Sequence, residues 1–541
     1  MSSKNQPHST FRPSMGWLHT WSGLLLGTLL FTVFFMGTLT VFNAEIDRWM
    51  QPETRFSADF HTAFNHDDIL ELVGSERPDA TFSRFSISMP EARRPFVVVY
   101  AQHEDGEFEL FRLDPKSGAL LPEAGSYGGT GFFYQMHIRL FMPGVAGWWI
   151  VMFAGLAMML LVITGVIIHR KIISDFFTFR PEKKLRRSSL DLHNLTGVVF
   201  LPFHFMIALS GLMIFSGWYS SIFFSHLPGE SGKRVAELLY SADEYGVFAR
   251  DALGEPAGEI VPVAPLVDQA EAIWTARYGE PASADYVDLR HMADANGYVA
   301  IRRVFPDRRV EQGVDKIVFD LSSGEQLADF QPTAVRSAQK WIAGLHFIQF
   351  EHWPLRWLYF MGGLAGCMMI ATGFIFWTAA RRKKGKLQPF KVRLVECISV
   401  GSTIGVVVAT GVFLVVNRLL PNGAAAFGLD RAQLEVGLFF LAWILAFVHA
   451  GFRKNASWAD QAWVLAALCI SAVLLNWATT GDHLVATTNG RLWAVAGVDL
   501  VLLTSAALAV WSASRLRRRG RVRTDSRMRL RGKPVIGTAV E

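Results

Sequence analysis

Six histidines of this 541-residue chain lie within or at the ends of long apolar stretches. They are His19, His137, His169, His193, His204 and His346. A polar side chain inside a membrane is energetically costly and is usually functional. Imidazole is also a strong axial ligand for haem iron. We therefore predict that this set includes axial haem ligands.

The strongest spacing is in LHNLTGVVFLPFHFMIALSG, residues 192–211, which contains His193 and His204. Eleven residues at 100° each end about 20° beyond three full turns, with a rise of roughly 16 Å. Both imidazoles are thus predicted on one helix face at two depths, where a single helix can ligate two stacked haems. Pro202 removes an N–H and crowds the Val198 carbonyl, so a kink that re-aims His204 is expected.

By depth, the histidines form two groups of three. His19, His169 and His193 are expected at the inner side, and His137, His204 and His346 toward the outer side. Two bis-histidine haems need only four ligands, so at least two of the six must bond propionates, tune the iron or pack. The axial candidates are His137, His169, His193, His204 and His346. His19 is a candidate haem-binding residue, although a lone histidine at a helix end, such as His19 or His137, is more often an ordinary interfacial residue.

The elements that must position these residues are membrane helices. With 51% hydrophobic and 18% charged residues, the composition excludes an ordinary soluble protein. Eight apolar runs are long enough to cross a bilayer. They lie near residues 16–42, 146–169, 194–217, 355–379, 396–420, 433–452, 460–479 and 492–514.

Clusters of Lys and Arg predict the orientation, because positive loops stay in the cytoplasm. They occur at 170–187, 381–393 and 515–533, after the second, fourth and eighth spans. Both termini are therefore expected in the cytoplasm, with 43–145 and 218–340 on the outer side. The net charge of +6 then reflects topology and contact with anionic lipid, not nucleic-acid binding.

An internal repeat organises the first four spans. LHTWSG at 18–23 matches LHNLTG at 192–197, and GLAMMLLVITG at 155–165 matches GLAGCMMIATG at 363–373. Another glycine, Gly37 or Gly211, follows fourteen residues after the glycine of each LHxxxG motif, and YQMHIRLF matches AGLHFIQF. The unit helix, outer module, helix is thus used twice in one orientation, with a pseudo-twofold axis along the membrane normal.

The outer segments repeat as well. Alternating apolar residues lead into a D-x-x-S-G turn twice, with Asp114 and Gly118 corresponding to Asp320 and Gly324. We expect each glycine to take a positive φ angle. The prediction is two small outer α+β modules, on a duplicated four-span core that is followed by an appended four-span bundle.

The predicted divisions of the chain follow from these patterns. They are 1–42 (N-terminus and first span), 43–145 (first outer module), 146–217 (second span, basic loop and third span), 218–340 (second outer module), 341–385 (fourth span), 386–514 (appended bundle) and 515–541 (basic tail).

Several other chemistries lack their motifs. The chain has no CxxCH for covalent c-type haem, and neither GxGxxG nor GxxxxGK[ST] for a nucleotide. All three cysteines, Cys367, Cys397 and Cys469, fall in predicted spans, so no disulfide framework is expected. Carboxylates within the spans are few, and Glu435 and Asp499 of the appended bundle either mark a proton or cation path or lie near an interface.

Longer motifs carry a family resemblance. TGVIIHRKIISDFFTFRP at 164–181, DLHNLTGVVFLPFHFMIALSGL at 191–212, and LHFIQF followed by WLYFMGGLAGCMMIATGFIFW resemble the PepSY-associated transmembrane family of PiuB-type inner-membrane proteins, over roughly residues 10–385. The resemblance implies a bacterial inner-membrane location and PepSY-type periplasmic modules. It also implies two haem b groups and reduction of ferric siderophores, and all six histidines fall on the family's recurring positions.

Three functional hypotheses follow. The first is a di-haem reductase that takes electrons from an external quinol or cytoplasmic reductase and releases Fe(II) from a ferric siderophore. The second is a transporter or permease that uses Glu435 and Asp499. The third is a periplasmic PepSY binding or inhibitory module on a passive membrane anchor. The siderophore, the oligomeric state and the role of the last four spans are not predicted.

Overall fold

A computed structural model describes most of the chain. The described residues are 11–57, 62, 64–78, 80–169, 172, 180–216, 250–304, 310, 315–384, 389–453 and 456–531. Several predicted segments lie partly outside the described residues. These are the end of the third span with the start of the second outer module (217–249), Arg170 and Lys171 of the first basic cluster, 385–388 of the second cluster and 532–541 of the tail.

Long apolar helices dominate the part of the chain that the structure describes, as predicted for a helical polytopic membrane protein. Seven of them are long and apolar enough to cross a membrane, and a bent pair makes up to eight. The four core spans are α1 (Phe11–Thr40), α5 (Ala146–Ile168), the pair α6 (Leu185–Val199) and α7 (Leu201–Ile214), and α12 (Trp353–Lys384).

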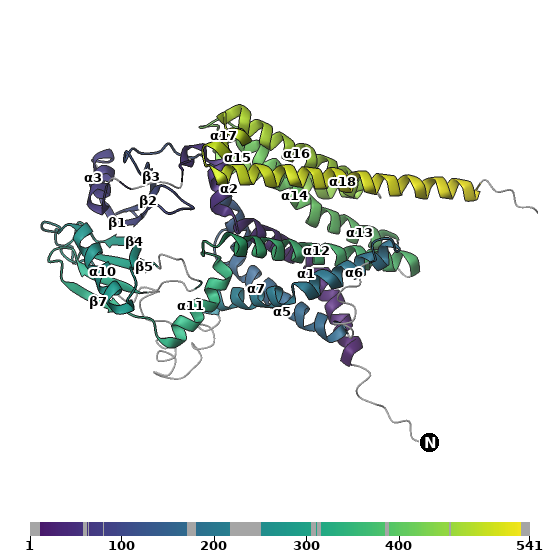
Figure 1. Cartoon of the computed structure of the whole chain (residues 1–541), viewed down its shortest axis with the longest axis horizontal. Helices are drawn as coiled ribbons and strands as arrows, with labels where there is room; N and C mark the ends of the chain where they lie inside the picture. Colours follow the sequence, from purple (N-terminus) through teal and green to yellow (C-terminus); the bar gives the residue numbers. More distant parts are fainter. Residues whose placement is uncertain are drawn as a thin grey trace, which may run out of the picture.

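The appended spans match the predicted runs. Their elements are α13 (Pro389–Val400), the π-helix η4 (Gly401–Gly405) and α14 (Val406–Leu419) in one span, then α15 (Arg431–Phe452), α16 (Ser457–Thr480), the short α17 (Leu484–Asn489) and α18 (Trp493–Arg531). Figure 1 shows α18 running well past the other helices, away from the sheet.

The third span is broken where Pro202 predicts a kink. α6 and α7 are bent by 64° at Phe200, because a proline near the start of α7 cannot continue the hydrogen bonds of α6. His193 and His204 therefore lie on two differently directed helices. The expectation of one continuous helix face carrying both imidazoles was wrong.

The outer segments form one antiparallel sheet. Its strands are β1 (Phe82–Ser88), β2 (Val97–His103), β3 (Phe108–Leu113), β4 (Ser283–Arg290), β5 (Tyr298–Val304), β6 (Lys316–Asp320) and β7 (Gln326–Phe330), in the order β3-β2-β1-β4-β5-β6-β7. The expected two modules are joined by pairing of β1 with β4, where Arg84 lies opposite Arg290. Each module covers the edge that the other would leave unpaired.

The two faces of the sheet differ in character. Odd-numbered residues such as Phe85, Phe111 and Val287 form a buried core with α3 (His66–Glu76) and α10 (Val263–Tyr278). Even-numbered residues point the other way, as strand geometry requires. Figure 1 places α3 and α10 on the side of the sheet away from the helical bundle, so the even face looks toward the bundle.

Both predicted turns have the expected geometry. Gly118 has a φ of 71° and Gly324 a φ of 72°. Asp114 accepts a hydrogen bond from the Lys116 amide at 2.8 Å, and Asp320 accepts one from the Ser322 amide at the same distance. The two turns therefore share the same glycine conformation and the same hydrogen bond from a backbone amide to the aspartate.

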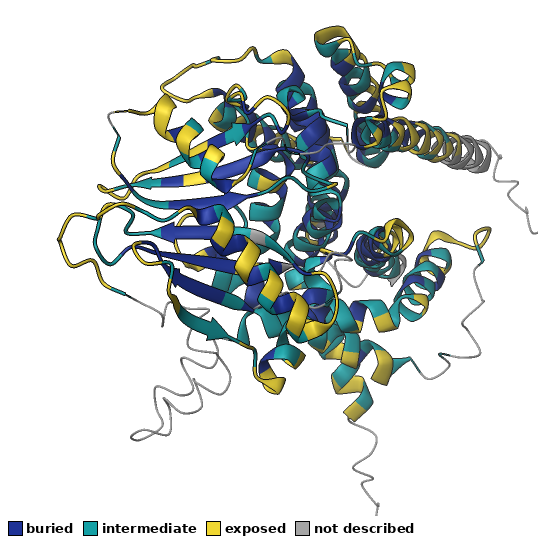
Figure 2. Ribbon diagram, turned by 60° about the vertical axis from the view of Figure 1, so that its left-hand side comes forward, coloured by how far each residue is buried: buried dark blue, intermediate teal, exposed yellow. Residues whose placement is uncertain are grey.

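Short helices connect the bundle to the sheet. They are α2 (Asn43–Met50), the 3-10 helix η2 (Pro52–Thr54), the π-helix η3 (Gly129–Tyr134), α4 (Gln135–Arg139) and α11 (Ala334–Phe347). Figure 2 shows buried residues both in the strands of the sheet and along the helices of the bundle.

The appended bundle packs on the first repeat. Phe132 of η3 stacks on Phe413 of α14 with ring centres 4.6 Å apart. The same buried cluster contains Phe31 and Met36 of α1 and Phe439 of α15. The appended spans thus support the segment that leads into α4.

Glu435 and Asp499 are buried at this contact. Glu435 accepts hydrogen bonds from Ser126 at 2.6 Å and Asn417 at 2.9 Å, and Asp499 accepts one from the Trp49 indole at 2.8 Å. Both carboxylates therefore anchor the appended bundle to the connectors on the sheet side of the bundle.

Asp67 offers a test of how the two modules are held together. Its carboxylate, on α3 of the first module, accepts hydrogen bonds from the Val263 and Ala264 amides at the start of α10 in the second, at 2.6 and 3.0 Å. Asp67→Ala leaves these amides without a cap and should lower the free energy of unfolding by about 1 kcal/mol. Thermal unfolding in detergent measures the loss. Glu71→Ala, at an exposed position of the same helix, is the control and should change little.

Candidate functional site

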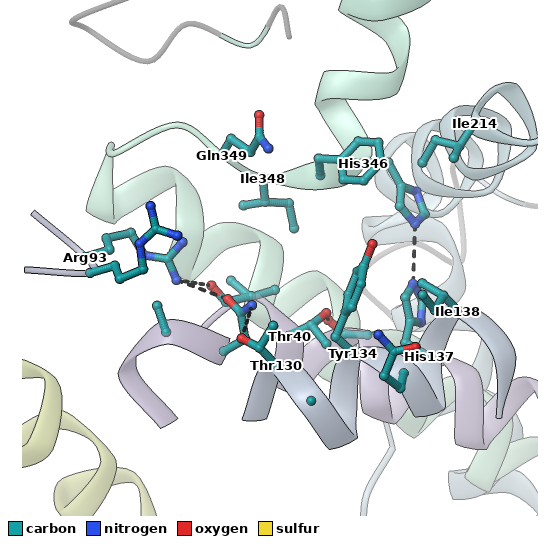
Figure 3. Close-up of a pocket in the computed structure, with 18 of the residues that line it drawn as sticks. Thr40, Arg93, Thr130, Tyr134, His137, Ile138, Ile214, His346, Ile348 and Gln349 are labelled. Atoms are coloured by element: carbon teal, nitrogen blue, oxygen red, sulfur yellow. Dashed lines mark hydrogen bonds between the residues drawn. The ribbon is translucent and has the colours of Figure 1, made fainter. Parts of the chain in front are cut away.

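His137 and His346 face each other at the sheet side of the core bundle. Their Nε2 atoms are 3.5 Å apart, and their rings are within 18° of parallel with centres 5.8 Å apart. The distance between the ring centres exceeds the Nε2–Nε2 distance by 2.3 Å, which is close to the width of an imidazole ring. The two Nε2 atoms therefore lie on the line between the ring centres. Figure 3 shows this head-on arrangement, with Tyr134 beside the pair.

Each ring of this pair is held in the same way. His137 Nδ1 lies 2.9 Å from the Val33 carbonyl of α1, and His346 Nδ1 lies 2.9 Å from the Ile207 carbonyl of α7. The rings also lie against glycines, since a Cβ built on Gly37 would be 2.7 Å from His137 and one on Gly211 would be 2.8 Å from His346. Any larger residue would displace the imidazoles.

His19 and His193 form a second pair near the opposite ends of the core helices. Their ring centres are 6.3 Å apart, with planes at 82°. His19 Nδ1 lies 3.1 Å from the Leu161 carbonyl of α5, and His193 Nδ1 lies 2.7 Å from the Met369 carbonyl of α12.

Glycines again lie against these rings. A Cβ on Gly165 would be 3.3 Å from His19, and one on Gly373 would be 3.4 Å from His193. In all four cases the carbonyl belongs to the residue four positions before the glycine, one helical turn away. One local design is therefore used four times.

The protonation of these rings follows from their partners. A backbone carbonyl only accepts hydrogen bonds, so each Nδ1 must carry the proton. A neutral imidazole then has an unprotonated Nε2 with a free lone pair. In the sheet-side pair the two lone pairs would point at each other at 3.5 Å. Two lone pairs at this distance repel each other, and a cation between the nitrogens, either a proton or a metal ion, would remove that repulsion.

His204 occupies a different environment. It lies on α7, is buried, and its Nε2 is 3.3 Å from the Gly362 carbonyl. Its neighbours are aromatic, with Phe34, Phe200 and Phe203 ring centres within 6.3 Å. The Nε2 nitrogen that would bind a metal is thus taken up by a helix carbonyl.

His169 ends α5 and is only partly buried. Neither His169 nor His204 faces a second histidine in the ring contacts of the described residues. The ring contacts thus give one pair within each expected group of three and leave His169 and His204 outside the pairs. His19, which was not among the axial candidates, belongs to a pair.

A large cavity connects the sheet-side pair to the sheet. It has a volume of about 1690 Å³, and both His137 and His346 line it. Its floor is apolar, with residues of α1, α5 and α7 such as Val151, Ala154 and Leu212. Its roof is the even face of the sheet, with many arginines. Figure 3 shows part of the lining, with Arg93 and the His137–His346 pair on opposite sides of the view.

Two carboxylates beside the cavity are tuned by their surroundings. Burial raises the pKa of Asp47, which accepts hydrogen bonds from the Thr130 amide at 3.0 Å and from its hydroxyl. Burial would also raise the pKa of Glu45, but hydrogen bonds and charge from Arg93 outweigh it and lower that pKa. Asp47 thereby holds η3, the segment that precedes the helix of His137.

Sequence reasoning missed the partners of the histidines. Gly37 and Gly211 were recognised as repeat equivalents, but not as the surfaces that receive the imidazoles. The signal was present, because His19 matches His193 and His137 matches His346 in the repeat. Two residues related by a twofold axis can meet at that axis. His169 and His204 have no histidine at the equivalent position of the other repeat, because they align with Trp377 and Leu30.

These features define a polytopic membrane protein with paired histidines in its core and an antiparallel sheet at one end. The chain matches the model of the PepSY-associated TM region family over residues 16–380, and it belongs to that family. The match contains all six predicted histidines and ends within α12, so the appended bundle lies outside it.

One relative is an uncharacterized Pseudomonas aeruginosa protein, PA4219. It is 24% identical over 393 residues, which cover 70% of this chain and 92% of PA4219. The similarity thus extends over most of the relative, whose function its name leaves open.

The glycine contacts give a direct test of the site. Gly37→Ala places a methyl group 2.7 Å from the His137 ring and should lower stability by about 1–3 kcal/mol through overpacking. Gly437→Ala is the matched control, because nothing lies within 4 Å of its added Cβ. That control should be neutral or gain about 0.5–1 kcal/mol from helix propensity. Equal thermal stability of the two variants would contradict the packing described here.

Proposed function

We propose that this protein is an inner-membrane di-haem b electron-transfer protein that reduces ferric siderophore complexes in the periplasm and so releases Fe(II). The observation that carries the proposal is the presence of two neighbouring imidazole pairs, one at each level of the core bundle, with Nδ1 of every ring engaged by a helix carbonyl. A hydrogen bond from Nδ1 to a carbonyl orients a histidine that binds metal through Nε2 and raises its basicity.

The distances fit a metal ion bound by both rings of a pair. An imidazole nitrogen binds a transition metal at about 2 Å, which sets two opposed Nε2 atoms about 4 Å apart. The sheet-side pair at 3.5 Å needs only a small outward movement. If the inner rings face each other likewise, their Nε2 atoms are 4.0 Å apart, which is the 6.3 Å between ring centres less the same 2.3 Å.

The ligand count favours haem over a bare ion. A protein site for a bare zinc ion uses three or four protein ligands, and the described residues contain no group of three or more His, Cys, Asp or Glu that could hold a metal. Two axial imidazoles suffice when a porphyrin supplies the equatorial nitrogens. The apolar floor of the cavity suits the porphyrin body, and the absence of CxxCH favours the non-covalent b type.

The two levels would connect the two sides of the membrane. His19 and Gly37, which mark the two levels on α1, are 18 positions apart, or roughly 27 Å along the helix. With the Lys and Arg clusters on the cytoplasmic side, the sheet and its cavity would lie in the periplasm. A quinol or a cytoplasmic reductase would supply electrons to the inner level, since the sequence shows no nucleotide motif.

Haem when bound supplies reversible one-electron chemistry. The chain would hold it with His19 and His193 at the inner level and with His137 and His346 at the outer level. The cavity would bind the ferric siderophore next to the outer level. Fe(II) is held more weakly than Fe(III) by hard oxygen ligands, so reduction would release the iron.

The other two hypotheses have less support. A transporter would use Glu435 and Asp499, but both are engaged in contacts at the sheet-side ends of their helices. A passive anchor needs no histidine pairs, so this hypothesis does not explain the pairs or the hydrogen bond that each of their rings makes to a helix carbonyl.

Substitution of single histidines tests the proposal and the ligand assignment together. The wild-type protein should contain two haems, measured as pyridine haemochrome per chain. His346→Ala and His193→Ala should each disturb one haem, with its loss or a low-spin to high-spin change in the electron paramagnetic resonance spectrum.

His204→Gln and His169→Gln are the comparison, and both should keep two low-spin haems. If His204→Gln lost a haem and His19→Ala lost none, His204 would be a ligand and His19 would not. A colourless protein from haem-supplied cells would end the proposal.

A further inference from the structure

The roof of the cavity carries cationic residues at regular positions. They occupy even-numbered sites on five strands of one sheet and include Arg84, Arg112, Arg290, Arg302 and Lys316. Because side chains alternate along a strand, the odd-numbered neighbours fill the core under α3 and α10. The cationic residues therefore share one face of the sheet, and that face is directed at the cavity.

Positive charge exceeds negative charge in the described lining. Ten cationic residues line the cavity against four carboxylates. The cationic residues are Arg48, Arg84, Arg93, Arg94, Arg112, Arg290, Arg302, Arg303, Lys316 and Lys340, and the carboxylates are Asp47, Glu91, Asp288 and Glu351. Glu45 and Asp315 hold Arg93 and Arg303 from outside this lining, and Arg302, Lys316 and Lys340 have further interactions of their own, so the lining is rich in cationic groups that are partly engaged.

Several of these guanidinium groups are fixed in position. Asp288 bridges Arg84 at 2.6 Å and Arg290 at 2.9 Å across the β1–β4 seam. A rigid arginine loses little conformational freedom when it binds an anion. Arg112, on β3, interacts electrostatically with Asp47 and Glu53. The buried Arg94 Nε has no hydrogen-bond partner among the described residues.

Apolar and aromatic side chains share this face. Tyr100 and Leu110 line the cavity and are 47% and 41% exposed. Tyr286, on β4, also lines the cavity, with the Arg302 guanidinium 4.9 Å from its ring centre. Such a surface can contact both the charges and the rings of an organic chelator.

We propose that the cavity binds its metal complex as an anion, with the even face of the sheet as the part that selects for negative charge. This rests on the proposed function for the iron chemistry, in which one electron leaves the reduced chain and Fe(III) in the bound chelate becomes Fe(II). The external quinol or reductase replaces that electron. At about 1690 Å³, the cavity exceeds the ~300–1,000 Å³ of ordinary ligand sites, so a whole chelate can enter.

Binding of redox-inert gallium(III) complexes to the full-length protein in detergent tests this step without electron transfer. The probes are an anionic gallium tris-catecholate and a neutral gallium trihydroxamate, measured by isothermal titration calorimetry. The anionic probe should bind more tightly, and added salt should weaken it. Arg112→Gln should raise its dissociation constant about tenfold, as expected for loss of one charge-assisted contact.

The controls separate this proposal from its alternatives. Arg77→Gln removes a positive charge from an exposed pair with Glu109 outside the cavity and should leave both affinities unchanged. Equal binding of the two probes, or no effect of Arg112→Gln and Arg302→Gln, would overturn the anion site. If these arginines instead held haem propionates, the variants would change haem content and leave gallium binding intact, which also overturns it. Charge-dependent binding in a protein without haem would keep the anion site and reject the reductase.

Discussion

The core of this protein depends on a hydrogen bond from an imidazole Nδ1 to a helix carbonyl, made four times. Each carbonyl lies one turn before a glycine, which leaves room for the ring to lie flat against the helix. The bond fixes the proton on Nδ1 and leaves Nε2 with a free lone pair. In the sheet-side pair the two Nε2 atoms face each other at 3.5 Å, a geometry that favours a cation between them.

Duplication explains why the pairs form where they do. Each pair takes one histidine from each repeat, so both pairs lie where the two repeats meet. The sheet obeys the same rule, because β1 of one repeat pairs with β4 of the other and Arg84 opposes Arg290. The cavity, its roof and its histidine floor are therefore all built at the contact between the halves. Only the appended bundle departs from this plan, since it packs on η3 and α2 of the first repeat.

Much of this arrangement could be predicted from the sequence. Hydropathy located all eight spans, the repeat located both D-x-x-S-G turns, and Pro202 located the break in the third span. Periodicity failed for His193 and His204, because it assumes a straight helix and the bend is 64°. Depth along the membrane grouped the six histidines by level but carried no information on which rings face each other. The joining of the two modules also escaped prediction, since strand patterns do not say which edges pair across the chain.

The division of each pair between the repeats has an evolutionary consequence. A chain with a single repeat would carry only half of each site and would complete it by associating with a second copy of itself. Fusion of two such copies removes that requirement and lets the halves diverge. The halves differ in this way at His204 and Pro202, since the repeat places Leu30 and Thr28 at the equivalent positions.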